Sequence, residues 1–142
     1  MIVSVTNGDI FETEHKHIAF AVNSEGVNDT GFAGFVARHY WPEIAYRAAW
    51  FPPRRHGLVL SMRLGNGRTL HALVCHSLSC DGWADTPCHV EQCLKSLPVP
   101  AGETIAMVRI GAGPVGRMMG ADWEAIERAV EASERPVAIY YL

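Results

Sequence analysis

The chain has 142 residues and a mass of 15.6 kDa, with 49% hydrophobic and 19% charged residues, a balance typical of a folded domain. Twelve Lys and Arg against fifteen Asp and Glu give a net charge of −3, so no excess positive charge drives non-specific binding to duplex DNA or anionic lipid. These values exclude a disordered or fibrous chain and predict a single domain over residues 1–142.

The sequence shows no segment that would direct it to a membrane. No apolar run reaches the roughly 18 residues that cross a bilayer, and no basic region precedes an apolar stretch at the N-terminus. We therefore expect a cytoplasmic protein. In that reducing compartment Cys75, Cys80, Cys88 and Cys93 would be thiols or metal ligands and not disulfides.

The first part of the chain alternates strand and helix patterns. Apolar runs predict strands at residues 2–5 and 17–22. A loop of glycines and small polar residues follows at 23–34, and apolar residues then recur at helical spacing over 35–50, with a break at Pro42. The expected order is strand, strand, glycine loop and helix.

The second part continues this alternation. Gly65-Asn66-Gly67 predicts a hairpin turn between strands at 58–64 and 68–74. Asp85 is a candidate N-cap for a helix that continues to Ser96. The remaining expected elements are a strand at 104–110, a glycine loop at 111–116, a helix at about 121–132 and a closing strand at 137–142.

Strands and helices that alternate without a linker predict an α/β fold with a mixed sheet. In such folds ligands bind beyond the carboxyl ends of the strands, where glycine-rich loops meet helix N-termini. The loops at 23–34 and 111–116 both fit this description. Because N–H groups of small residues can surround an anion, they predict a ligand that contains phosphate.

The segment MVRIGAGPVG contains the pattern G-x-G-x-x-G, which also occurs in dinucleotide-binding folds. Only 26 residues follow Gly116 (142 − 116), too few for the rest of such a domain, and Pro114 with the stretch RMMG is expected to delay the helix. A phosphate-binding loop is therefore favoured over a flavin or nicotinamide site. A plain turn between strand and helix is the remaining alternative.

Four segments resemble the macrodomain family, whose members bind ADP-ribose and in several branches hydrolyse its esters or glycosidic links. The segments are Gly8-Asp9-Ile10, AVNS at 21–24, the loop centred on Gly31, and RIGAG at 109–113. The chain also has a tyrosine, Tyr140, in the strand expected at its end. In this feature it resembles the branch that includes terminal ADP-ribose glycohydrolase and the DNA-acting antitoxins. The resemblance implies one three-layer α/β/α sandwich with a central mixed β-sheet.

The resemblance also implies roles for individual positions. Asp9 would accept a hydrogen bond from the adenine amino group, Ile10 would pack beside the base and Tyr140 would stack on it. Asn23 and Ser24 would lie near the distal ribose. Two loops would hold the diphosphate, and their residues are Gly31, Phe32, Ala33, Gly111, Ala112, Gly113, Pro114, Val115 and Gly116.

Each of these residues also has a purely structural interpretation. Asp9 is placed to cap a turn, and Tyr140 is typical of a half-buried strand aromatic. Asn23 and Ser24 are typical of residues that satisfy backbone groups of a loop. Their joint placement favours the nucleotide site.

The catalytic pattern of the resembled branch is incomplete in this chain. That branch has a lysine at the end of the strand that reads LVCHS here, and an aspartate near positions 114 and 115, which are proline and valine. His76 is the best substitute as acid or base, although a histidine at a strand end is more often a structural hydrogen-bonding group. Asp29 and Glu25 are the carboxylates nearest the expected ribose.

A doubled pattern C-H-x-x-x-C, at Cys75 to Cys80 and at Cys88 to Cys93, raises the alternative of a zinc site. Structural zinc sites use shorter cysteine pairs, and buried cysteines commonly pack as small apolar residues. Packing is therefore the favoured interpretation, and we expect no bound metal and no cofactor. The loop at 81–85 between the two patterns is expected to be exposed and to border the cleft.

The sequence thus predicts a module that binds ADP-ribose, free or attached to a protein or nucleic acid. Hydrolysis of the ADP-ribosyl link is one hypothesis, and binding without turnover is another. A nucleic acid would be a partner only as a modified substrate, and no membrane partner is expected. Another nucleotide-binding module and a zinc-stabilised interaction module are the remaining alternatives.

Overall fold

The computed structural model, which describes residues 1–79 and 81–142, is built around one six-stranded sheet with the order β1-β6-β5-β2-β4-β3. The strands are β1 (Ile2–Asn7), β2 (His17–Asn23), β3 (Val59–Arg63), β4 (Thr69–His76), β5 (Ile105–Val108) and β6 (Val137–Tyr141). Neighbouring strands are parallel except for the antiparallel pair β3 and β4. The sheet is mixed, as the sequence predicts.

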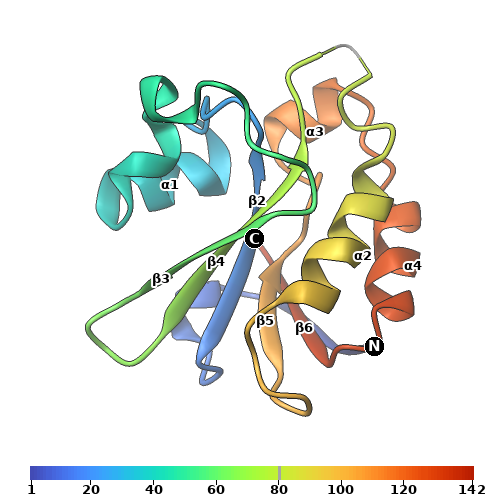
Figure 1. Cartoon of the computed structure of the whole chain (residues 1–142). Helices are drawn as coiled ribbons and strands as arrows, with labels where there is room; N and C mark the ends of the chain where they lie inside the picture. The colour runs from blue at the N-terminus through green and yellow to red at the C-terminus, as the bar shows by residue number, and fades with distance from the viewer. Residues whose placement is uncertain (80) are drawn as a thin grey trace.

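Helices cover both faces of this sheet (Figure 1). The helix α1 (Gly31–His39) lies on one face together with short 3-10 turns, and α2 (Thr86–Ser96) and α4 (Trp123–Ala132) lie side by side on the other. This is the expected three-layer α/β/α sandwich. In the described part of the chain, no helix is long and apolar enough to cross a membrane.

Strand β2 shows why the chain forms three layers. Side chains of a strand point alternately to the two faces of a sheet, and in β2 both sets are apolar and buried. Ile18 and Phe20 pack in the core beneath α1, whereas Ala19 belongs to the core beneath α2 and α4. A strand buried on both faces requires a helical layer on each side.

The segment at 35–50 differs from the expected single broken helix. The helix α1 begins earlier, at Gly31, and ends at His39, and two 3-10 turns, Pro42–Ala45 and Arg47–Trp50, replace its second part. Proline has no N–H group and cannot continue an α-helix from within. Pro42 therefore begins a new turn.

A short helix that the sequence pattern did not predict, α3 (Pro114–Met118), begins inside the expected glycine loop at 111–116. The expectation that Pro114 delays the helix is wrong, because the fixed φ angle of proline suits the first turn of a helix. The helix at 86–96 has the expected bounds, but the side chain of Asp85 makes no capping hydrogen bond.

A chain of polar side chains crosses the sheet near the amino ends of β2 and β4. His17 Nε2 lies 3.2 Å from a carboxylate oxygen of Glu103, and His17 Nδ1 lies 2.9 Å from Nε2 of His71. The hydroxyl of Ser61 lies 2.7 Å from Nδ1 of His71. Burial, together with the nearby His17, lowers the pKa of His71 to about 4, so this imidazole is neutral at pH 7.

This lowered pKa predicts a loss of stability in acid. Between pH 6.5 and 4 the unfolded chain binds a proton at His71 that the folded chain does not, so the free energy of unfolding falls as pH decreases. We expect His71 to account for a fall of about 2 to 3 kcal/mol between pH 7 and 4.5. Urea unfolding at pH 7 and at pH 4.5 measures this fall in the free energy of unfolding.

The variant His71→Gln should show a smaller fall over the same pH range, whatever its stability at pH 7. The matched control is His39→Gln, at the exposed end of α1. Equal falls in the unaltered protein and in His71→Gln would contradict the prediction.

Candidate functional site

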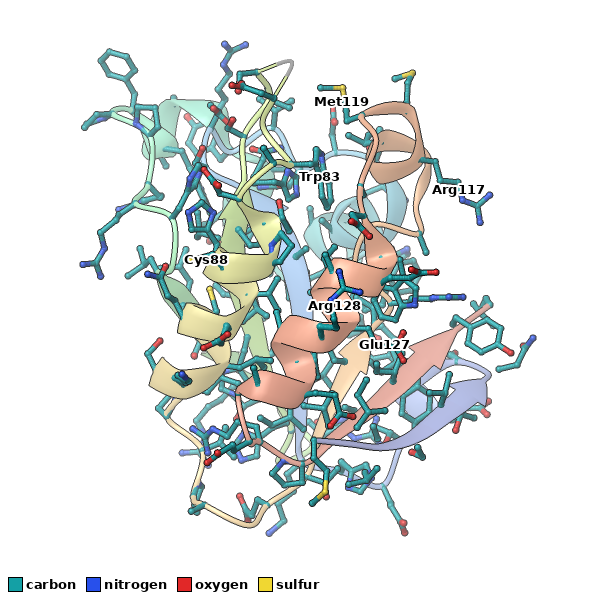
Figure 2. All side chains as sticks on the ribbon, turned by 90° about the vertical axis from the view of Figure 1, so that its right-hand side faces the viewer. Trp83, Cys88, Arg117, Met119, Glu127 and Arg128 are labelled. Carbon is teal, nitrogen blue, oxygen red and sulfur yellow. The ribbon has the colours of Figure 1, made fainter. Side chains whose placement is uncertain are left out.

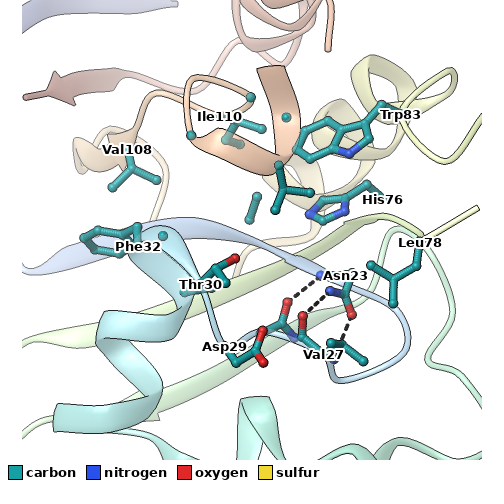
Figure 3. Close-up of a pocket in the computed structure, with 18 of the residues that line it drawn as sticks. Asn23, Val27, Asp29, Thr30, Phe32, His76, Leu78, Trp83, Val108 and Ile110 are labelled. Atoms are coloured by element: carbon teal, nitrogen blue, oxygen red, sulfur yellow. Dashed lines mark hydrogen bonds between the residues drawn. The ribbon is translucent and has the colours of Figure 1, made fainter. Parts of the chain in front are cut away.

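Two cavities open at the carboxyl ends of the parallel strands. The first, shown in Figure 3, has a volume of about 260 Å³, and the second has about 470 Å³. Both are lined by Phe32, Val108, Arg109 and Gly113, so they adjoin each other along one wall. Together they form a cleft between α1 and the loop that follows β5.

The loop after β2 forms one wall of the first cavity and is held by the side chain of Asn23. The side-chain nitrogen of Asn23 donates to the carbonyl oxygen of Val27 at 2.7 Å, and its side-chain oxygen accepts from the N–H of Val27 (Figure 3). The same oxygen also accepts from the N–H of Glu25. The polar side-chain atoms of Asn23 are therefore bonded to backbone groups of the loop. Ser24 is buried and lines neither cavity.

The N-terminus of α1 lies at the first cavity. Gly31, Phe32 and Ala33 line the cavity, and the first amides of a helix have no carbonyl partner within it. The N-cap residue Thr30 makes no side-chain capping bond. This end of the helix is therefore suited to an anion.

The second wall is the glycine-rich segment 111–116, which leads from β5 into the first turn of α3. Gly111 has φ of +86°, a conformation that favours glycine. A Cβ atom at Gly116 would lie 2.6 Å from the carbonyl oxygen of Gly111 and 2.7 Å from its Cα. The loop closes on itself only because residue 116 has no side chain, and this closure shapes the cavity wall.

The second cavity is largely apolar and aromatic, with one carboxylate side chain and two guanidinium groups, those of Arg109 and Arg117. Asp9 and Ile10 line it from one side and Tyr140 from another. The carboxylate of Asp9 accepts a hydrogen bond from the N–H of Phe11 at 2.9 Å and caps the short turn Ile10–Glu12. The hydroxyl of Tyr140 donates to Oγ1 of Thr13 at 2.9 Å. A flat apolar ring with a polar edge fits these surroundings.

His76 and Trp83 form the far wall of the first cavity. Their rings stack with centroids 4.0 Å apart and planes inclined by 14°. Burial, together with the nearby His56, lowers the pKa of His76 to about 4. Within the described residues, His76 Nδ1 and Trp83 Nε1 are buried without a hydrogen-bond partner.

The two C-H-x-x-x-C patterns do not converge on a metal site in the described part of the chain. Cys75 and Cys93 are buried, and burial raises the pKa of both thiols, that of Cys93 to about 12. Protonated thiols in a core agree with the packing interpretation. Cys88 is exposed, and Cys80 lies outside the described residues.

Most of the residues expected at the site lie together in this cleft. The first cavity is lined by Asn23, Asp29, Gly31, Phe32, Ala33, His76, Gly111, Gly113, Val115 and Gly116, and the second by Asp9, Ile10, Phe32, Ala112, Gly113 and Tyr140. Asp29 is exposed at the mouth of the first cavity. The side chain of Pro114 lies outside the described part of the structure.

Several lining residues were not identified as site residues from the sequence. They are Val27, Asn28, Leu78, Trp83, Arg109 and Ile110 in the first cavity and Phe11, Phe35, Arg109, Arg117 and Tyr141 in the second. The expected bordering loop at 81–85 contains Trp83, but this indole is buried and not exposed. The sequence signal that could have identified Trp83 as a lining residue is an aromatic side chain within an otherwise polar loop.

The architecture and the cleft together define a class of fold, that of the macrodomains. The chain is similar to a macrodomain protein from Streptomyces coelicolor, with a TM-score of 0.73 and 20% identity over 100% of this chain and 99% of that one. It is also similar to the macrodomain of Mycobacterium tuberculosis DarG, with a TM-score of 0.71 and 18% identity over 100% and 98%.

A third neighbour is a Trypanosoma brucei macrodomain in complex with ADP-ribose, with a TM-score of 0.66 and 15% identity over 98% of this chain and 62% of that one. No model of a known protein family matches the chain, and no curated protein matches it in sequence. At these identities the likeness shows a shared fold.

The close contact at Gly116 predicts a specific loss of stability. In Gly116→Ala the new methyl group would overlap the backbone of Gly111, so we expect the free energy of unfolding to fall by about 1 to 3 kcal/mol. The matched control is Gly113→Ala in the same loop, where a Cβ atom meets nothing within 4 Å. Urea unfolding compares the two variants, and equal losses would contradict the assignment.

Proposed function

We propose that the chain binds ADP-ribose, free or attached to a macromolecule, across the two adjoining cavities. The observation that supports this most is their connection through Phe32, Val108, Arg109 and Gly113, which makes the two cavities one continuous cleft. A structural neighbour that holds ADP-ribose supports the same ligand.

In this proposal each part of the ligand has a chemical match. The adenine ring lies in the second cavity, with its amino group donating to Asp9 and its face against Tyr140. The diphosphate lies between the amides of 31–33 and the loop at 111–116. The distal ribose then extends toward Asp29 and His76 in the first cavity.

The macromolecule to which the ADP-ribose is attached would be a modified protein or nucleic acid. The distal ribose would lie at the open side of the first cavity, where Asp29 is exposed and Leu78 is 45% exposed. We also propose a relation to the branch of terminal ADP-ribose glycohydrolase and the DNA-acting antitoxins. The closing strand with Tyr140 and the likeness to DarG support that relation.

Titration calorimetry with ADP-ribose tests the binding proposal, and Asp9→Asn tests its adenine end. The amide keeps an oxygen that can accept from Phe11 N–H but loses the charge, so affinity should fall about 10-fold, or about 1.4 kcal/mol. Glu12→Gln, in the same short turn and outside both cavities, is the matched control. Unchanged affinity in Asp9→Asn would remove Asp9 from the site.

Hydrolysis of the ADP-ribosyl link is the second candidate function, and His76 is the residue that favours it. The imidazole is neutral at pH 7 and lines the first cavity, where the anomeric carbon would lie. It would accept a proton from the attacking water, and the carboxylate of Asp29 would stabilise positive charge that develops on the ribose. A base of such low pKa is weak, so turnover would be slow.

His76→Phe separates hydrolysis from binding because a phenyl ring retains the stacking on Trp83 but has no ring nitrogen. ADP-ribose affinity should change less than about 3-fold, and hydrolysis of a peptide carrying ADP-ribose on a glutamate should fall by about 100-fold. Equal rates in both proteins would exclude His76 from the reaction. If the unaltered protein shows no turnover, hydrolysis is excluded and ADP-ribose binding is the only function that we propose.

A further inference from the structure

Two guanidinium groups line the second cavity and have no role in the scheme above. Arg109 follows β5 directly, and Arg117 lies on α3, from which it extends away from the body of the molecule (Figure 2). The proposed diphosphate site consists of backbone amides. Arg117 lines only the second cavity, at the adenosine end of the cleft, and Arg109 lies where the two cavities adjoin.

Arg109 is held in place by two aromatic rings. Its guanidinium carbon lies 4.7 Å from the centroid of the Trp123 ring and 5.8 Å from that of Tyr141. Contacts of this kind fix the plane of the group while its N–H donors stay available at the edges. Ordering the side chain in advance lowers the entropy cost of binding an anion.

No carboxylate side chain neutralises these groups. The ion pairs among the described residues join His17 to Glu103 and Lys95 to Glu91, so Arg109 and Arg117 are both unpaired. Asp9 is the one acidic side chain among the described residues of this cavity, and it caps the turn at Phe11.

We infer that Arg109 and Arg117 form a subsite for an additional phosphate group, attached to the 2′ or 3′ oxygen of the adenosine ribose. This rests on the proposed function, because it needs the adenine ring between Asp9 and Tyr140. The ribose then lies between the base and Gly113, beside the part of the cavity that these arginines line. Two guanidinium groups match a phosphate dianion in charge, and each can donate paired hydrogen bonds to its oxygens.

The chain would accordingly prefer a nucleotide phosphorylated on its adenosine ribose to plain ADP-ribose. The test compares the affinities of ADP-ribose and ADP-ribose 2′-phosphate by calorimetry at low ionic strength. We expect the phosphorylated ligand to bind about 10-fold more tightly, and we expect added salt to reduce the difference. Adenosine 2′,5′-bisphosphate and 3′,5′-bisphosphate, each compared with adenosine 5′-monophosphate, distinguish the two positions of the phosphate.

The variant Arg117→Gln should lose most of the preference while it still binds ADP-ribose. The matched control is Arg128→Gln, which removes the same charge from the exposed face of α4 (Figure 2). Arg109→Lys keeps the charge but gives up the planar stacking, and it should retain only part of the preference.

The possible results separate this inference from the proposed function. If ADP-ribose binds and the added phosphate brings no gain, the subsite is wrong and the proposed function stands. A gain that survives in Arg117→Gln, or that is lost equally in Arg128→Gln, also overturns it. If ADP-ribose itself does not bind, the proposed function fails.

Discussion

The structure depends on the burial of both faces of its central strands. β2 lies between β4 and β5, and its apolar side chains enter one core beneath α1 and another beneath α2 and α4. With both faces closed by helices, polar ligands have access to the sheet only at its ends. The candidate site lies at the carboxyl ends, where the loops after β2 and β5 turn away from the sheet.

Much of the polarity in these loops is already used within the protein. Asn23 and Asn28 direct their amide groups to backbone partners, including the carbonyl oxygen of Ile44, and the Tyr140 hydroxyl is bonded to Thr13. These side chains give the cleft a fixed shape. Backbone amides, aromatic surfaces and the few charged groups without a partner are therefore the groups that remain available to contact a ligand.

The sequence allowed the layers of the fold to be predicted because they follow from local patterns. Apolar runs and the turn residues around Gly65 to Gly67 located the strands of the sheet and its antiparallel hairpin within two residues at each end. The short helix at Pro114 was missed because a proline can end one helix or begin another. Here the close approach of Gly116 to Gly111 decides that Pro114 begins a helix.

The candidate site was predictable in its loops but not in its distant contacts. The glycine loops and Asp9 are marked by local sequence, and the structure brings them to one cleft. Trp83 stacks on His76, and Trp123 and Tyr141 hold Arg109. Most of these contacts join elements that are far apart in the chain. No local pattern indicates such pairs.

The wall formed by His76 and Trp83 also limits the chemistry of the first cavity. The imidazole is buried beside the stacked indole, and desolvation by burial is the main cause of its lowered pKa. The same packing that gives the ribose end a rigid wall thus makes His76 a poor proton acceptor. A rigid cavity with a weak base is better suited to holding a nucleotide than to rapid hydrolysis, and for that reason binding is the primary function that we propose.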